Sequence, residues 1–244
     1  MRGALVVGGA NGIGLAIATL LAEDERFGRV YIVDRQEVTD GYSHPKFEYV
    51  SFDLRSEDYS LFDSFGDVDT LVITAGFGRL AHFADVDEQH IVDSFTVNST
   101  AVIRIIRHFY ERLEGREDFY CAVMGSIAGF ISSPLFAVYG ATKAALRIFI
   151  ESVNVELEMR GSHNRILNIS PGSIKGTAFY NGANDLGITR HLASDILTHL
   201  WAKDDLFIPQ YDEVFKGVLE RYHADFRAEG RHSYEYKMQS GRVK

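Results

Sequence analysis

The sequence predicts a single α/β domain in which helices flank one parallel sheet on both faces. Short apolar runs alternate with amphipathic helical segments along most of the chain. Several of these runs are apolar almost without interruption, as expected of strands that are buried on both faces. A glycine-rich turn joins the first run to the first helical segment, which is typical of a doubly wound sheet.

The elements follow one another in the order that this class requires. A strand at 4–7, a helix at 13–23 and a strand at 29–34 have together the length of one β–α–β unit. The Gly- and Asn-rich segment 173–191 interrupts the pattern and is predicted to be a mobile loop with short helices. The further predicted strands are 47–54, 69–76, 119–126, 165–172 and 206–209, and the further predicted helices are 87–113, 138–160, 192–203 and 211–226.

Composition narrows the class of protein and its location. The 244 residues carry a net charge of -9, which disfavours nucleic-acid binding. No apolar run approaches the roughly 20 residues that cross a bilayer, and the first residues lack the apolar core of a signal peptide. The one cysteine, Cys121, cannot form an internal disulfide. We therefore expect a cytoplasmic protein without a membrane partner.

The segment "VGGANGIG" is a candidate phosphate-binding loop. Gly8, Gly12 and Gly14 lie between the first strand and the first helix, where glycine lets the backbone turn tightly and approach a ligand. Asp34 follows 20 residues after Gly14, at the end of the second strand, where a carboxylate can bind ribose hydroxyls. The pattern predicts a Rossmann-like, dinucleotide-binding sheet.

Asp34 also bears on the choice of dinucleotide. A carboxylate at this position repels a 2′-phosphate and favours NAD(H) over NADP(H). Arg35 weakens this argument, because a guanidinium can bind that phosphate. The sequence favours NAD(H) and leaves NADP(H) open.

Two tyrosine–lysine pairs share one spacing. In "YSHPK", at 42–46, Pro45 disfavours helix, so the side chains need not share a face. In "YGATK", at 139–143, the pair opens a strongly helical segment, where residues four apart are neighbours. A lysine beside a phenol lowers the phenol's pKa and so prepares it for proton transfer near neutral pH. The second pair is the chemical candidate.

Two polar residues support that choice. Ser126 ends the predicted strand 119–126, at the edge of the sheet where doubly wound folds bind ligands. Asn98 interrupts an apolar helical stretch, which is costly unless the amide has hydrogen-bond partners. We expect both residues to belong to a polar network around Tyr139.

These features together resemble the short-chain dehydrogenase/reductase family, in its single-domain type. The resemblance runs from Met1 to about Thr177. Its motifs are the glycine loop 8–14, Asp34, "DL" at 53–54, "TAG" at 74–76, Asn98, "GSIAG" at 125–129, "YGATK" at 139–143 and "SPG" at 170–172. The chain departs from the family at Val7, where threonine is common, and at Thr74, where the family has asparagine.

The resemblance implies a role for each matching residue. Tyr139 would be the catalytic acid/base, and Ser126 would hydrogen-bond the reacting oxygen. Lys143 would lower the pKa of Tyr139 and bind the nicotinamide ribose, and Asn98 would position a water in a proton relay to Lys143. The implied cofactor contacts are Gly8, Asn11, Gly12, Ile13, Gly14, Asp34, Arg35, Asp53, Leu54, Ala75, Gly76, Tyr139, Lys143, Pro171, Gly172 and Thr177. No metal is implied.

We therefore predict an NAD(P)-dependent oxidoreductase that interconverts a secondary alcohol and a carbonyl by hydride transfer. One alternative is a non-catalytic regulator that binds the dinucleotide. Another is an epimerase or dehydratase of the same superfamily, which usually carries a longer C-terminal substrate domain. A fairly apolar substrate is expected from the side chains in the surrounding segments, which are Phe77, Phe130, Leu135, Phe136, Phe179 and Tyr180.

The C-terminal segment sets the predicted domain boundary. We predict one dinucleotide-binding and catalytic domain at 1–226 and a basic tail at 227–244. The tail is predicted to be either disordered or docked on a partner subunit. We expect a homo-oligomer, either a dimer or a tetramer.

Overall fold

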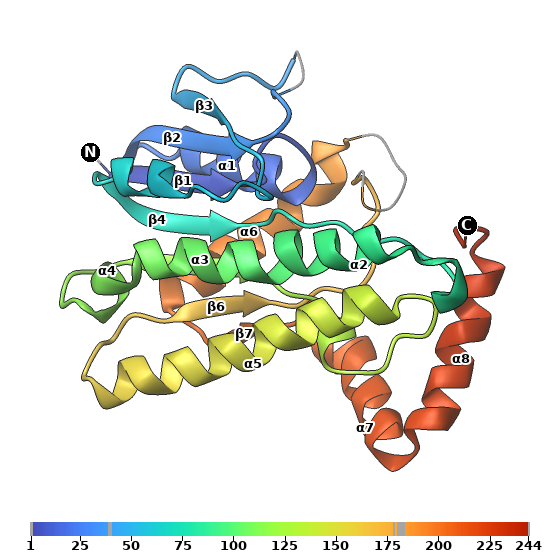
Figure 1. Cartoon of the computed structure of the whole chain (residues 1–244). Coiled ribbons are helices and arrows are strands. Elements are labelled where there is room, and N and C mark those ends of the chain that lie inside the picture. The colour runs from blue at the N-terminus through green and yellow to red at the C-terminus, as the bar shows by residue number, and fades with distance from the viewer. Residues whose placement is uncertain (1, 39–40, 178, 180–183, 244) are drawn as a thin grey trace.

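Parallel strands form one sheet between two layers of helices in the computed structural model, which describes residues 2–38, 41–177, 179 and 184–243 (Figure 1). Within these residues seven strands pair in the order β3-β2-β1-β4-β5-β6-β7, and the order reverses between β1 and β4. The strands are β1 (Arg2–Val7), β2 (Phe27–Asp34), β3 (Phe47–Ser51), β4 (Val68–Ile73), β5 (Tyr120–Met124), β6 (Ile166–Ile169) and β7 (Leu206–Phe207). The predicted Rossmann-like, doubly wound α/β fold is confirmed.

The two faces of the sheet bury two separate apolar cores. Leu5 and Val7 of β1 belong to the core beneath α3 (Ala101–His108) and α5 (Ala137–Met159). Val6 points to the other face, beneath α1 (Gly12–Glu23) and α6 (Leu186–Ala202). The remaining α-helices of the described residues are α2 (Glu88–Phe95), α4 (Tyr110–Glu114), α7 (Lys216–Ala224) and α8 (Phe226–Gln239).

The helix predicted at 87–113 is not continuous. The carboxylate of Asp87 accepts a hydrogen bond from the His90 amide and begins α2, and α2 runs into a π-helical turn at Thr96–Thr100. The chain then continues as α3 and the short α4. π-Helical turns are frequent at functional sites. This turn contains Asn98, so the prediction of one regular helix was wrong at a predicted site residue.

Five of the predicted strands end earlier than expected, including the neighbouring strands β4, β5 and β6. β4 ends at Ile73, β5 at Met124 and β6 at Ile169. Ala75, Ser126 and Pro171 therefore lie in the loops that follow the strands, at the carboxyl edge of the sheet. Loops at this edge form the ligand sites of doubly wound folds.

Helix α6 begins six residues before the predicted start at 192. The carboxylate of Asp185 accepts hydrogen bonds from the Gly187 and Ile188 amides and caps the helix. The irregular segment after β6 is therefore shorter than predicted.

The C-terminal helices α7 and α8 form a hairpin beyond the end of the sheet (Figure 1). Lys237 of α8 donates hydrogen bonds to Ser133 Oγ at 2.6 Å and to the Pro134 carbonyl at 2.9 Å. Arg221 of α7 pairs with Glu229 of α8 at 2.7 Å. Residues 226–239 thus form a helix against their own chain, and docking of the tail on a partner subunit stays a prediction.

No helix among the described residues is both long enough and apolar enough to cross a bilayer.

Candidate active site

The glycine loop between β1 and α1 forms a close-packed cradle. Gly8 has a φ of +84°, and a Cβ there would lie 2.4 Å from the Ala75 nitrogen. A Cβ on Gly14 would lie 2.2 Å from the Gly8 carbonyl oxygen and 2.4 Å from Thr74 Oγ1. Neither position accepts a side chain, whereas a Cβ on Gly12 would meet only Thr177, at 3.5 Å. Gly12 begins α1, where the backbone amides of a helix N-terminus can bind a phosphate group, so the loop fits a dinucleotide.

Thr74 supplies the hydroxyl that braces this loop. Its Oγ1 donates to the Gly8 carbonyl at 3.0 Å, and its amide donates to the Val7 carbonyl at 2.8 Å. The hydroxyl that Val7 lacks is therefore supplied by the residue that follows the neighbouring strand β4.

Asp34 ends β2 beside the glycine loop. One carboxylate oxygen accepts the Ala10 amide and the other accepts the Gln36 amide, both at 3.1 Å. These bonds fix the carboxylate at the position where a ribose would lie. The adjacent Arg35 is exposed.

The other predicted dinucleotide contacts lie after β3, after β6 and at the start of α1. Arg55 binds the Asp53 carboxylate at 2.6 Å, and that hydrogen bond lowers the pKa of Asp53 to about 2. Leu54 is buried in the core. A Cβ on Gly172 would lie 2.6 Å from the Phe215 ring, so the loop after Pro171 passes close to the turn before α7. Asn11 precedes α1, and Ile13 is half-buried within it.

Sequence reasoning missed Asn184. Its side-chain carbonyl accepts the Gly12 amide at 2.8 Å, although the two residues are far apart in sequence. This amide is one of the groups that the start of α1 would offer to a phosphate. Only the folded chain brings Asn184 to this position, because it lies in the irregular segment before α6.

The π-helical turn places Asn98 in a fully buried polar network. Its Oδ1 accepts the Phe77 amide at 2.9 Å, and its Nδ2 donates to the Phe77 carbonyl at 2.8 Å and to Thr142 Oγ1 at 3.2 Å. The prediction that this amide has polar partners is confirmed. Asn98 thereby joins the loop after β4 to α5.

Lys143 lies beside Asn98. Its Nζ donates to the Met124 carbonyl at 2.7 Å, at the end of β5. A Cβ on Gly76 would lie 3.2 Å from Asn98 Oδ1 and 3.5 Å from Lys143 Nζ, so both atoms face this glycine. The absence of a side chain at position 76 keeps the space between them open.

Tyr139 and Ser126 complete the group. Tyr139 and Ser126 are each only 9% exposed, and the Ser126 hydroxyl lies near enough to lower the pKa of Tyr139 by hydrogen bonding. The Ala128 amide donates to Ser126 Oγ at 3.2 Å and orients the hydroxyl. The structure therefore brings Asn98, Ser126, Tyr139 and Lys143 together, from three different elements.

Burial is the main cause of the pKa shifts of Tyr139 and Lys143. It raises the pKa of Tyr139 to about 12, against the lowering effect of the hydrogen bond with Ser126. Burial also lowers the pKa of Lys143 to about 8. The expectation that Lys143 lowers the pKa of Tyr139 is therefore not met here. The ammonium binds the Met124 carbonyl and lies 5.6 Å from the centre of the Tyr139 ring.

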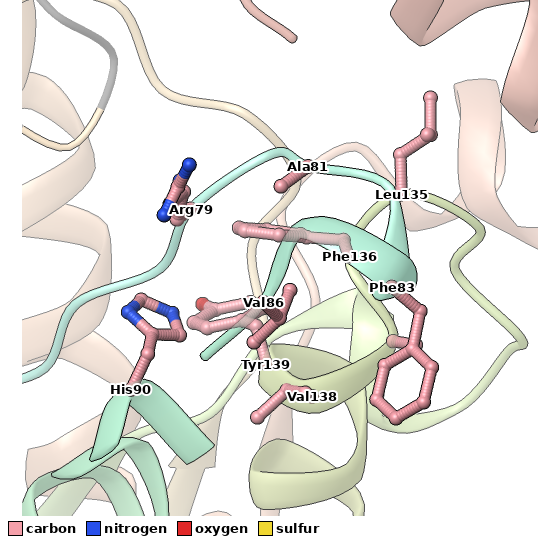
Figure 2. Close-up of a pocket in the computed structure, with 10 residues that line it drawn as sticks. Arg79, Ala81, Phe83, Val86, His90, Leu135, Phe136, Val138 and Tyr139 are labelled. Carbon is pink, nitrogen blue, oxygen red and sulfur yellow. The ribbon is translucent and has the colours of Figure 1, made fainter. Parts of the chain in front are cut away.

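A small cavity opens at Tyr139. Phe136 stacks on the Tyr139 ring with centroids 4.2 Å apart, and Phe179 lies 5.3 Å from the same ring. Figure 2 shows two further side chains, Arg79 and His90, on the side to which the Tyr139 hydroxyl points. Sequence reasoning missed both, because neither stands in a motif.

The predicted apolar surroundings are only partly correct. Leu135 and Phe136 line the cavity, and Phe83 and Val86 line it without having been predicted. Phe130 instead packs under the Arg147 guanidinium, and Phe77 packs against His90. Tyr180 lies outside the described residues. Among the described residues no cluster of three His, Cys, Asp or Glu side chains could hold a metal ion.

Comparisons with known proteins point to one family. The family model described as short chain dehydrogenase matches residues 2–185. A short-chain type dehydrogenase/reductase of Sinorhizobium fredii, itself uncharacterised, is 29% identical over 79% of this chain and 77% of its own. An NADP-dependent (R)-specific alcohol dehydrogenase of Lentilactobacillus kefiri is 28% identical over 70% of this chain and 73% of its own.

A solved structure shows the same fold. A short-chain dehydrogenase from Burkholderia cenocepacia, in complex with NADP, superposes with a TM-score of 0.77 at 22% identity, covering 96% of this chain and 99% of that one.

Proposed function

The chain belongs to the short-chain dehydrogenase family and is an NAD(P)-dependent oxidoreductase, and on that premise we propose that Tyr139 is the acid/base in the interconversion of a secondary alcohol and a carbonyl. One observation carries the proposal. The Tyr139 hydroxyl, next to Ser126, opens on a cavity, while Lys143 and Asn98 face Gly76.

The dinucleotide supplies the hydride in the reduction and accepts it in the oxidation. In the reduction, Tyr139 donates its phenolic proton to the carbonyl oxygen, and Ser126 donates a hydrogen bond to the same oxygen. A phenol with a pKa of about 12 carries its proton at neutral pH, which is the form that this step needs.

Lys143 and Asn98 act behind the phenol. Because the pKa of Lys143 is about 8, its ammonium can return a proton to the Tyr139 side of the site near neutral pH. We assign to Asn98 the role of positioning a water between Asn98 and Lys143, because Asn98 Oδ1 and Lys143 Nζ face the same glycine, Gly76. Lys143 would also bind the nicotinamide ribose.

We propose NAD(H) as the preferred dinucleotide. The Asp34 carboxylate is held against the glycine loop by the Ala10 amide and would repel a 2′-phosphate. The glycine loop, the loops after β2, β3, β4 and β6, and the Tyr139–Lys143 pair would supply the contacts predicted above. Titration with NADH and with NADPH tests the preference, and tighter binding of NADPH would overturn it.

The test of the catalytic role is Tyr139→Phe. Turnover of a panel of alcohols and ketones should fall by about 10²- to 10⁴-fold, because the general acid is lost. Dinucleotide binding, followed by nicotinamide fluorescence, should persist. Full retained turnover would overturn the role of Tyr139. If the unmodified protein binds the dinucleotide tightly and turns over no substrate in the panel, the result would favour the alternative of a non-catalytic, dinucleotide-binding regulator.

The cytoplasmic location and the dimer or tetramer remain parts of the proposal. The acidic composition and the single cysteine support the location. Light scattering of the purified protein tests the oligomeric state, and a monomer at micromolar concentration would overturn it.

A further inference from the structure

Two basic side chains line the substrate side of the cavity at Tyr139. Arg79 comes from the loop after β4, and His90 comes from the first turn of α2. Figure 2 shows both on the side of the Tyr139 ring that carries the hydroxyl, with Phe136 stacked over the ring. A substrate oxygen at the Tyr139 hydroxyl would therefore lie on the side of the ring where these two groups are found.

Within the described part of the chain, Arg79 has no carboxylate within 4.0 Å and no hydrogen bond. Many arginines of this acidic chain do have such a partner, for example Arg2 with Asp69 and Arg160 with Glu114. Asp87, three residues before His90, accepts a hydrogen bond from the His90 backbone amide at 2.7 Å. The charge of the Arg79 guanidinium thus remains available to a ligand.

His90 is placed by packing and keeps its ring nitrogens available. Its ring meets the Phe77 ring edge-on at 5.5 Å, and Phe77 is itself bonded to Asn98. Among the described residues, no side chain or backbone group forms a hydrogen bond with the imidazole nitrogens. The network that orients Asn98 therefore also orients a hydrogen-bonding group toward the substrate.

Gly78 shows how closely this loop is fitted to the site. A Cβ there would lie 2.6 Å from the Phe136 ring and 2.8 Å from the Tyr139 ring. The backbone passes against the aromatic pair, and the next residue, Arg79, is consequently carried to the rim of the same cavity. The opposite walls are apolar, formed by Val86, Leu135 and Phe136.

We propose that the substrate bears a carboxylate, which Arg79 binds with His90 beside it, while its apolar part lies against Phe136. A guanidinium and a carboxylate form paired, charge-assisted hydrogen bonds, which hold the reacting carbon in one orientation. The substrate class is thus an oxo acid or the matching hydroxy acid with an apolar body. This inference rests on the proposed function, because it places the reacting oxygen at Tyr139.

The decisive measurement is binding without turnover. Calorimetry on the full chain with the oxidised dinucleotide would compare straight-chain and aryl 2-, 3- and 4-oxo acids with their methyl esters, since no hydride is then available. At least one acid should bind about 10- to 100-fold more tightly than its ester, as expected for hydrogen bonds to a charged group. Arg79→Met should abolish that preference, and Arg79→Lys should retain part of it.

Arg116→Met is the matched control, because it removes the same charge from an exposed position before β5, at the opposite edge of the sheet. It should leave the preference intact. The proposal is overturned if no acid binds more tightly than its ester, or if the preference survives Arg79→Met. It is also overturned if Arg116→Met removes the preference equally, or if a phosphonate with the same body binds more tightly than the acid.

Turnover separates this inference from the proposed function. With reduced dinucleotide, Arg79→Met should lower kcat/KM for the acid by about 10- to 100-fold, mainly through KM, and change it little for the ester. An acid preference in binding that depends on Arg79, together with a complete lack of turnover, would support the carboxylate site and contradict the oxidoreductase chemistry at Tyr139.

Discussion

The two tyrosine–lysine segments have one spacing and two different environments. Tyr42 and Lys46 lie in the loop between β2 and β3, where Lys46 donates to the Asp24 carbonyl at 3.0 Å and Tyr42 to the Asn184 carbonyl at 3.5 Å. Tyr139 and Lys143 lie one turn apart on α5 and are almost completely buried.

The comparison shows that helix and burial, rather than spacing, distinguish the two pairs. On α5 both side chains leave water, and burial raises the pKa of Tyr139 and lowers that of Lys143. Both shifts arise because burial disfavours the charged form of each side chain, the phenolate of Tyr139 and the ammonium of Lys143. Perturbed groups of this kind concentrate in functional sites.

Replacing the lysines one at a time gives the sharpest contrast. Lys143→Met should lower turnover by about 10²-fold or more, because the positive charge behind Tyr139 is lost. Lys46→Met removes one hydrogen bond to a backbone carbonyl and should leave turnover within about twofold. Steady-state rates of the two variants check this, and equal losses would erase the distinction between the pairs.

The burial of Lys143 predicts a pH-dependent stability. Below pH 8 the folded and unfolded states both carry the ammonium, and burying it costs about 3 kcal/mol, since its pKa falls from 10.5 to about 8. Between pH 8 and 10.5 the unfolded state binds more protons, so the free energy of unfolding rises with pH. The stability advantage of Lys143→Met over the unmodified chain should therefore shrink by about 3 kcal/mol across this window.

Denaturant titrations at pH 7, 9 and 10.5 measure that difference. The raised pKa of Tyr139 and the lowered pKa of Lys237 affect both proteins alike and cancel. If the free energies of unfolding of the two proteins changed equally with pH, the lysine charge would be solvated in the folded state.

A smaller effect on dinucleotide binding is expected from Asn184, which lies between Tyr42 and the glycine loop. Asn184, which Tyr42 contacts, occupies the Gly12 amide that a phosphate would need. Asn184→Ala should bind the dinucleotide about 2- to 10-fold more tightly, since one competing hydrogen bond is lost. Fluorescence titration measures this, and weaker binding would show that the amide instead helps to hold the dinucleotide.

The smallest effect is expected for Tyr42→Phe. Its hydrogen bond is long, at 3.5 Å, so the free energy of unfolding should change by less than about 0.5 kcal/mol. Turnover should be unchanged, in contrast to Tyr139→Phe. A loss of more than tenfold in turnover would give the loop tyrosine a role that its surroundings do not suggest.

Local pattern alone predicted much of this protein. Alternating strands and helices predicted the doubly wound sheet, and Gly8, Gly14 and Asp34 marked the dinucleotide loop, because these features depend on residues close together in sequence. The helical context of Tyr139 and Lys143 distinguished the proposed catalytic pair from the pair at Tyr42 and Lys46 for the same reason.

Other features were decided by packing between distant segments. The π-helical turn exists where Asn98 binds Phe77 and Thr142, which no helical periodicity encodes. His90 reaches Tyr139 because α2 packs against α5, and Arg79 reaches it because the loop at Gly78 passes against the Phe136 and Tyr139 rings. The sequence by itself determined the family of reactions, through residues that act locally. The tertiary structure decided which side chains line the cavity at Tyr139 and how far burial shifts the pKa values, because both depend on neighbours brought together by folding.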